Sequence, residues 1–181
     1  MKPRKPAVIA VVGSKSSGKT TLIEILTHEL TKRGYRVAAV KHVPDEAFTI
    51  DTEGKDTWRF TMAGAKTVIA VSPKEIATIE KMDANLLTLK DIVEKCLVSD
   101  VVIVEGFRKL LGMDMKVPKI VTVKSTEEAA EAMKAFKPIM AFAGFHQMGE
   151  MRLNAPYLNL PEDSGKLTNI VEEFIKRGGN V

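Results

Sequence analysis

The chain contains a single cysteine, Cys96, among its 181 residues. One cysteine excludes an internal disulfide, and such sparing use of the residue agrees with the reducing cytoplasm. Cys96 falls on the apolar face of a predicted helix, where a free cysteine usually fills the core. We therefore expect a cytoplasmic protein whose cysteine has a packing role.

Long apolar runs are also absent. No stretch approaches the roughly 20 residues that a membrane-spanning helix needs, so we expect no membrane partner. Lys2, Arg4 and Lys5 precede the apolar residues 7–12, as cations do at the start of a secretory signal. That run ends at Gly13, however, and residues 13–20, Gly-Ser-Lys-Ser-Ser-Gly-Lys-Thr, match the phosphate-binding pattern G-x-x-x-x-G-K-[ST] in the place of a cleavage site. We therefore predict that residues 7–12 form a buried strand.

Charge of one sign is not in large excess. The chain has 27 Lys and Arg residues against 23 Asp and Glu residues, which gives a net charge of +4. Phosphate-binding residues and a basic N-terminal tip account for so mild a bias, and we expect no nucleic-acid partner. His28 and His146 have no companions at ligand spacing, so no protein metal site is predicted beyond Mg²⁺ bound with a nucleotide.

A pattern of short apolar runs followed by helix-period segments recurs along the chain. It predicts one α/β domain over residues 1–181, a P-loop NTPase-type three-layer sandwich with a mostly parallel sheet flanked by helices. Strands are expected at residues 7–12, 36–41, 67–72, 76–82, 101–104, 119–123 and 139–143, with helices around residues 22–30, 89–97, 129–136 and 167–175. Residues 45–64 are expected to form a long loop with one helical turn near residues 57–62. Ser125 and Glu128 have capping-box spacing and are expected to begin the helix that contains residues 129–136.

A phosphate-binding motif follows the first strand. Residues 13–20 read Gly-Ser-Lys-Ser-Ser-Gly-Lys-Thr and satisfy G-x-x-x-x-G-K-[ST] in full, between a predicted strand and a predicted helix. The glycines let the backbone curl until its N–H groups point at phosphate oxygens. Lys19 is expected to reach the β- and γ-phosphates, and Thr20 to offer its hydroxyl to Mg²⁺. The predicted nucleotide-binding residues are Gly13, Ser14, Lys15, Ser16, Ser17, Gly18, Lys19, Thr20 and Thr21.

Acidic residues near this motif are candidates for holding the metal or its water. Glu105 follows the predicted strand at residues 101–104, where a neighbouring strand of a P-loop protein carries such an acid. The loop at residues 45–64 adds Asp45, Glu46, Asp51, Glu53 and Asp56, and composition does not choose between a metal-binding and a solvated loop. His42 ends the second strand, where it either orients a water, contacts phosphate or lies on the surface.

Taken together, these residues resemble the MobB family of molybdopterin-guanine dinucleotide biosynthesis adaptors, GTP-binding P-loop proteins related to the metallocentre-assembly GTPases. The resemblance covers most of the first 120 residues. It rests on the phosphate loop and on Lys41-His42, Ile50-Asp51, Gly54-Lys55-Asp56-Thr57 with Arg59, Ala63-Gly64-Ala65, Val104-Glu105-Gly106-Phe107-Arg108 and Pro118-Lys119-Ile120.

The resemblance implies a homodimer that binds GTP and Mg²⁺ and hydrolyses GTP weakly. It also implies a role in attaching GMP to molybdopterin, with a molybdenum-cofactor guanylyltransferase and other molybdopterin-handling proteins as partners. Carried over by position, the catalytic candidates are Lys19, Asp51, Asp56 and Glu105, and the metal candidates are Thr20, Asp51 and Glu105.

The chain departs from the family pattern in two places. Val43-Pro44-Asp45 follows the Lys-His pair, where family members often carry further histidines, and the C-terminal third matches in outline. No Asn-Lys-x-Asp segment follows a late strand, so GTP is implied by the resemblance alone. Residues 122–125 and 154–156 occupy plausible places for base contacts. Lys15 is not at the second loop position, so we do not expect it to activate hydrolysis in a partner subunit.

Two other functions fit the phosphate loop. The first is a small-molecule kinase or ATP-dependent ligase, which usually closes an arginine-bearing lid. The arginines Arg59, Arg108 and Arg152 are far apart in the sequence, which disfavours such a lid. The second is a metal-insertion GTPase, which calls for a Cys-x-His ligand pair that this sequence lacks.

Overall fold

The computed structural model describes residues 5–83, 86–149 and 152–179. The basic tip at Lys2 and Arg4 lies outside the described residues. The chain divides into two compact units, one formed by Met1–His42 with Thr88–Val181 and the other by Val43–Leu87. The second unit is thus inserted in the sequence between two parts of the first, and each unit has its own sheet.

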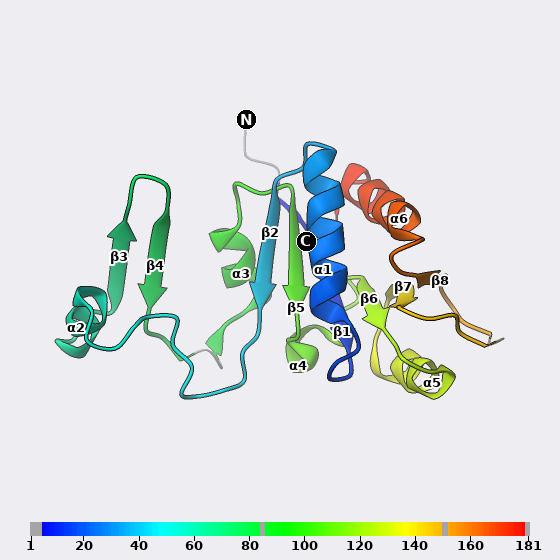
Figure 1. Cartoon of the computed structure of the whole chain (residues 1–181), viewed down its shortest axis with the longest axis horizontal. Coiled ribbons are helices and arrows are strands. Elements are labelled where there is room, and N and C mark those ends of the chain that lie inside the picture. Colours follow the sequence, from blue (N-terminus) through cyan, green and yellow to red (C-terminus); the bar gives the residue numbers. More distant parts are fainter. Residues whose placement is uncertain (1–4, 84–85, 150–151, 180–181) are drawn as a thin grey trace. The chain divides into compact units, whose positions relative to one another are not determined.

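The first unit is built on a six-stranded sheet in which all neighbouring strands are parallel (Figure 1). Its strands are β1 Ala7–Gly13, β2 Val37–Lys41, β5 Val101–Glu105, β6 Lys119–Thr122, β7 Ile139–Gly144 and β8 Tyr157–Asn159, in the spatial order β2-β5-β1-β6-β7-β8. β1 and β5 are continuous apolar runs because strands of a parallel sheet are covered on both faces. Ile9 and Ile103 are accordingly fully buried.

Helices cover this sheet, which confirms the predicted α/β class. They are α1 Lys19–Lys32, α3 Leu89–Lys95, α4 Arg108–Leu111, α5 Thr126–Ala135 and α6 Ser164–Lys176. α1 and α6 lie side by side over one face (Figure 1). Leu22, Leu26 and Leu30 of α1 form one core with Val171 and Ile175 of α6.

Alternate residues of β1 point to opposite faces of the sheet. Ile9 and Val11 belong to the core beneath α1 and α6, while Val8 and Ala10 face away from it and are equally buried. β1 therefore lies at the centre of the unit, and the loop that follows it begins from a rigid support.

The second unit contains one helix and one antiparallel hairpin. α2 spans Asp56–Met62, and β3 Thr67–Val71 pairs with β4 Ile76–Glu80. The sequence predicts both strands, but its strand-helix pattern predicts no separate sheet. The physical reason is the connection: four residues join the strands, and the Ser72 N–H donates to the Glu75 carbonyl oxygen at 2.8 Å. So short a turn fits only an antiparallel pair, since parallel strands need a long crossover.

Other differences from the prediction are small elements. α2 has seven residues where one turn is predicted, and α4 and β8 have four and three residues and are not predicted at all. These elements are shorter than the stretch of sequence over which a hydrophobic period can be recognised, so the pattern cannot reveal them. The remaining elements begin and end close to the predicted residues. Along the described ranges, no helix has the length and apolar character that crossing a membrane demands.

Candidate functional site

The phosphate loop connects β1 to α1 and takes a backbone path that requires glycine. Gly18 has φ of 87°, a left-handed conformation, and a Cβ there would overlap the ring of Phe145. Ser16 also has a left-handed φ, 58°. A non-glycine residue in this region is uncommon and is found mostly in turns and functional sites. The loop is thus curled tightly between strand and helix, as the motif predicts.

Backbone amides of this loop face no protein acceptor. Over the part of the chain that the structure describes, no N–H of residues 14–21 donates to a backbone or side-chain oxygen. α1 also begins without a side-chain cap and without an acidic residue in its first turn. The first amides of a helix carry partial positive charge, so a run of them is an anion-binding site. The geometry suits a chain of phosphates.

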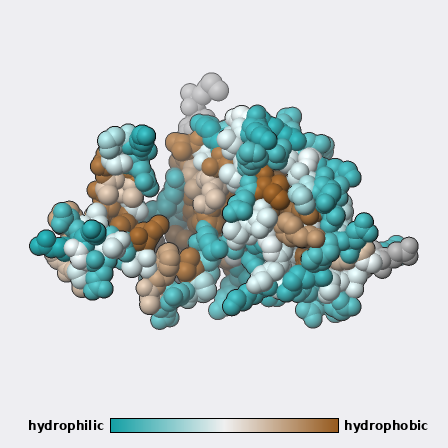
Figure 2. All heavy atoms as spheres, viewed as in Figure 1, coloured by the Kyte–Doolittle hydropathy of each residue, from teal (hydrophilic) through white to brown (hydrophobic). Residues whose placement is uncertain are grey.

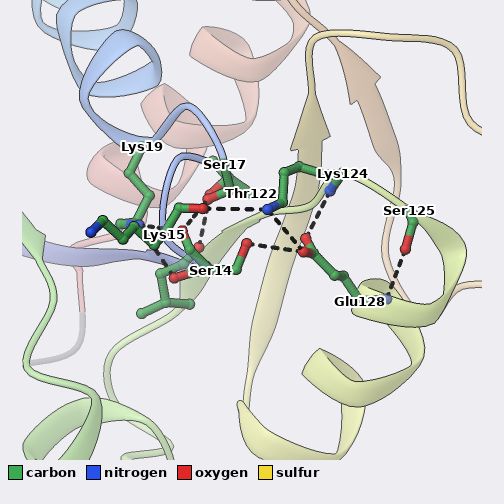
Figure 3. Close-up of polar contacts among 10 residues, drawn as sticks. Ser14, Lys15, Ser17, Lys19, Thr122, Lys124, Ser125 and Glu128 are labelled. Atoms are coloured by element: carbon green, nitrogen blue, oxygen red, sulfur yellow. Dashed lines mark hydrogen bonds and ion pairs between the residues drawn. The ribbon is translucent and has the colours of Figure 1, made fainter.

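The ammonium group of Lys19 lies against the loop. Its Nζ donates to the carbonyl oxygens of Gly13 at 3.3 Å and Ser14 at 2.6 Å (Figure 3). Thr20 and Thr21 are exposed in the first turn of α1, and the Lys15 side chain is exposed too. Lys19 is therefore held at the loop where the motif predicts it, while Thr20 is open to solvent and to ligands.

Ser17 ties the loop to the neighbouring strand β6. Its side chain is buried, donates to the Ser14 carbonyl oxygen at 2.8 Å and lies 2.6 Å from the Thr122 hydroxyl oxygen. Thr122 in turn donates to the Val12 carbonyl oxygen at 3.3 Å. Ser17 is predicted to bind phosphate, but its hydroxyl is used inside the protein, which leaves its amide for a ligand.

Glu105 ends β5 at the edge of the sheet where the phosphate loop begins. It pairs in register with Val11, two residues before Gly13, because β1 and β5 are parallel neighbours. Glu105 and Thr20 both line an open groove of about 540 Å³. Lys41 Nζ lies 3.2 Å from the Glu105 carboxylate. The structure thus brings together two of the three predicted metal candidates, as oxygen donors of the kind Mg²⁺ prefers.

Asp51 and Asp56 belong to the second unit. The Asp51 Oδ1 accepts from the Thr57 hydroxyl at 2.8 Å and from the Thr52 N–H at 2.9 Å, whereas its Oδ2 is buried without a hydrogen-bond partner in the described chain. Asp56 is the first residue of α2, highly exposed, and 3.6 Å from Arg59. Their role beside the phosphates stays a prediction. In the described ranges, no three His, Cys, Asp or Glu residues form a ready metal cluster.

His42 packs against an aromatic neighbour. The His42 ring lies 4.9 Å from the ring of Phe107, centroid to centroid, at an angle of 54°. The backbone N–H of His42 donates to the Glu105 carbonyl oxygen. Phe107 itself has a left-handed φ of 51°. The contacts of His42 are those of a packed surface residue at the end of β2.

Glu128 lies at the site although the sequence assigns it only to a helix cap. Ser125 and Glu128 have capping-box spacing, and the Ser125 hydroxyl accepts from the Glu128 N–H at 3.3 Å, which confirms half of that box. The other half is wrong, because the Glu128 carboxylate accepts from Lys124 N–H at 2.9 Å and from the Ser14 hydroxyl at 3.0 Å. Spacing predicts the cap but cannot reveal a partner 114 residues away.

Comparison with known proteins connects this site to one family. The family model described as MobB, molybdopterin guanine dinucleotide synthesis protein B, matches residues 8–144. A putative molybdopterin-guanine dinucleotide biosynthesis adapter protein of Methanocaldococcus jannaschii is 40% identical over 123 residues, 66% of this chain and 48% of that protein. The Haemophilus influenzae adapter protein is 36% identical over 104 residues, 56% of this chain and 57% of its own. The chain thus spans about half the length of these curated relatives.

Solved structures agree with this match. A crystal structure of molybdopterin-guanine biosynthesis protein B (mobB) has a TM-score of 0.70 and 28% identity, with 93% of this chain and 99% of that chain covered. Bacillus subtilis MobB has a TM-score of 0.68 at 24% identity, with 91% of this chain and 97% of that chain covered, which supports the fold.

Proposed function

Because this chain belongs to the MobB family, we propose that it is a nucleotide-controlled adapter in the biosynthesis of molybdopterin-guanine dinucleotide. One observation carries the proposal: the amides of residues 14–21 have no acceptor within the described protein, and Lys19 Nζ lies beside them. This arrangement stabilises a polyanionic phosphate tail. We also propose that residues 1–181 act as one nucleotide-binding domain in the cytoplasm.

The phosphates would meet two kinds of positive group. The amides at the start of α1 supply fixed partial charges that need no rearrangement, and the Lys19 ammonium group supplies a full charge on a flexible stem. Replacing the carbonyl contacts of Lys19 by phosphate contacts exchanges neutral acceptors for anionic ones, so the attraction between opposite charges is added to hydrogen bonds that the ammonium group already strengthens.

Mg²⁺ would be held by residues of the same groove. The donor set fits the ion, because Thr20 and Glu105, which carry a hydroxyl and a carboxylate, both line the groove and Mg²⁺ is usually bound by one or two protein ligands together with phosphates and water. When bound, the ion neutralises phosphate charge. We propose Asp51 as a further ligand and Asp56 as a nearby acid, on the family resemblance.

We propose GTP as the nucleotide and weak hydrolysis as the reaction that resets the adapter. Guanine is supported by the family rather than by side chains near Lys124 or Asn154. The proposed partner is the guanylyltransferase that attaches GMP to molybdopterin, together with other molybdopterin-handling proteins. A second copy of this chain is proposed as a further partner.

Titration calorimetry with GTP, GDP and ATP, each with Mg²⁺, tests this function. We expect GTP to bind more tightly than ATP, with heat released at a stoichiometry of one nucleotide per chain. A clear preference for ATP would overturn the adapter reading in favour of a kinase or ligase. The arginines do not favour that alternative, because Arg59 lies near Asp56 and Arg108 lies over the ring of Phe136 at 5.2 Å.

A further inference from the structure

A carboxylate from α5 reaches the outer side of the phosphate loop (Figure 3). Glu128 lies in the first turn of α5, behind the cap Ser125. One of its oxygens, Oε1, accepts from the Ser14 hydroxyl at 3.0 Å, and the other, Oε2, accepts from the Lys124 N–H at 2.9 Å. Glu128 therefore joins the start of the loop to the corner between β6 and α5.

Lys124 adds a second connection at the next loop residue. Its Nζ donates to the carbonyl oxygen of Lys15 at 3.3 Å and lies 3.4 Å from Glu128 Oε1 (Figure 3). Ser14 and Lys15 are thus both held from outside the motif, by a pair of residues that hold each other. These contacts are separate from the inner contact between Ser17 and Thr122.

A carboxylate beside a site for a polyanion is unfavourable on charge alone. Lys124 offsets this charge at close range. Burial by itself would raise the pKa of Glu128, but hydrogen bonds from Lys124 and Ser14 outweigh it, and the pKa lies below its ordinary value. The Glu128 side chain is therefore a carboxylate at neutral pH and would repel phosphate. We infer that its contacts with the loop offset this unfavourable charge.

We propose that Glu128 is a positioning residue for the nucleotide: it holds Ser14 directly and Lys15 through Lys124, so that the amides of residues 14–16 are oriented before the phosphates arrive. This inference rests on the proposed nucleotide binding by the loop. Glu128 itself touches no phosphate. Its contribution is preorganisation, since a loop that is already ordered loses less conformational entropy when the ligand binds.

A double-mutant cycle tests the route through Ser14. We expect Glu128→Ala and Ser14→Ala each to weaken Mg²⁺-GTP binding, Glu128→Ala by roughly tenfold, with the double variant little weaker than Glu128→Ala alone. Glu128→Gln keeps the length of the side chain but offers one acceptor oxygen in place of two, so it can accept from Ser14 or from the Lys124 N–H and should restore part of the affinity. Glu131→Ala, exposed and one turn further along α5, is the matched control and should bind like the wild type.

The same variants can be compared without nucleotide. The ¹⁵N heteronuclear NOE of the amides of residues 14–16 should fall in Glu128→Ala and stay unchanged in Glu131→Ala, because the former loses the contact that orders them. If Glu128→Ala folds poorly, the same NOE measurement is made on Ser14→Ala, which removes one exposed hydroxyl and the same contact.

The outcomes separate this inference from the proposed function. A wild-type protein that binds no nucleotide contradicts the function, whereas the loop NOE still reports on Glu128. Wild-type affinity in Glu128→Ala, or strictly additive losses in the cycle, would overturn the positioning role while the function stands.

Discussion

At the scale of single residues, Glu105 lies both beside the phosphate loop and in the groove that contains Thr20. It ends the strand beside the phosphate loop, its side chain is 13% exposed, and it shares a groove with Thr20. Lys41 is its partner at 3.2 Å. A metal ion at Thr20 would compete with the Lys41 ammonium group for the same carboxylate oxygens.

We therefore predict that Glu105→Ala reduces the dependence of GTP affinity on Mg²⁺. The gain in affinity on adding Mg²⁺ should shrink by roughly tenfold, a typical effect of altering the surroundings of a bound metal. Glu24→Ala is the control, since Glu24 is exposed in the same groove on α1. Calorimetry with and without Mg²⁺ measures the effect. If Mg²⁺ raises the GTP affinity of Glu105→Ala as much as that of the wild type, Glu105 is not a metal ligand.

Lys119 is a fully buried lysine at the start of β6. Its Nζ donates to the carbonyl oxygens of Asp114 and Lys137, both at 2.6 Å. Burial lowers the pKa of Lys119 to about 8 from an ordinary value of 10.5, and nearby Asp114 opposes this shift. The side chain thus connects the loop before β6 to the residue before Pro138.

We predict that Lys119→Met lowers the free energy of unfolding by about 1–3 kcal/mol, because two partly buried carbonyls lose their donor. Between pH 8 and 10.5 the unfolded chain holds more protons on Lys119 than the folded one, so this group makes the wild type more stable as pH rises. The loss in Lys119→Met should therefore grow with pH in urea titrations. A loss of stability that shrinks between pH 8 and 10.5 would contradict the lowered pKa of Lys119. Lys116→Met, exposed nearby, is the control.

At the scale of elements, the Glu172 carboxylate of α6 forms an ion pair with Arg33 at the end of α1. Glu172 of α6 accepts from Arg33 at 2.7 Å and from the Tyr35 hydroxyl at 3.1 Å, and Lys176 lies 2.9 Å away. Hydrogen bonds from Lys176, Arg33 and Tyr35, in that order, lower the pKa of Glu172 to about 2. This contact continues the apolar packing of the two helices.

We predict that Glu172→Gln destabilises the protein at neutral pH and that the difference from wild type disappears in acid. The stabilisation is fully present above the ordinary pKa of about 4.5 and is lost as pH falls toward 2, because the folded state then gains the proton. Glu173→Gln, an exposed neighbour paired with Arg177, should have little effect at either pH. Thermal melts between pH 2 and 7 measure both, and a constant difference would contradict the prediction.

Elements with a full local signal could be predicted from the sequence. The phosphate loop is encoded in eight consecutive residues, and α1 shows its apolar face and its glycine stop at Gly34. The contacts of Glu128 depend on how α5 is placed beside the loop, and no local pattern records this. The pairing of β3 with β4 depended on the length of one turn, which the strand pattern ignores.

At the scale of the whole molecule, the hairpin unit leaves many apolar side chains exposed. Val71 and Ile76 form a cross-strand pair, 73% and 70% exposed, and Ile69 lies two residues from Val71 on the same face at 59%. Figure 2 shows apolar surface on β3 and β4. Exposed patches of this kind mark interaction sites, and a two-stranded hairpin is rarely stable alone. A second copy of the chain is the partner we propose for it.

We predict that the double variant Val71→Lys with Ile76→Lys raises the dissociation constant of the proposed homodimer by roughly tenfold or more. Burying two ammonium groups in an apolar contact is costly. Lys74→Glu, in the turn between the strands, changes charge without removing apolar surface and serves as the control. Sedimentation velocity over a range of concentrations measures the dimer. A monomeric wild type would contradict the dimer, and an unaffected double variant would place its interface elsewhere.

The central claim for the molecule is that the loop from β1 to α1 binds a nucleotide through its phosphates. The most direct test is Mg²⁺-GTP binding by calorimetry to the wild type and to Lys19→Ala, with circular dichroism and thermal melting as checks on the fold. We predict that the variant keeps its fold and loses roughly a hundredfold in affinity, as the loss of a charged hydrogen-bonding partner implies. Equal affinity in the two proteins would contradict the account.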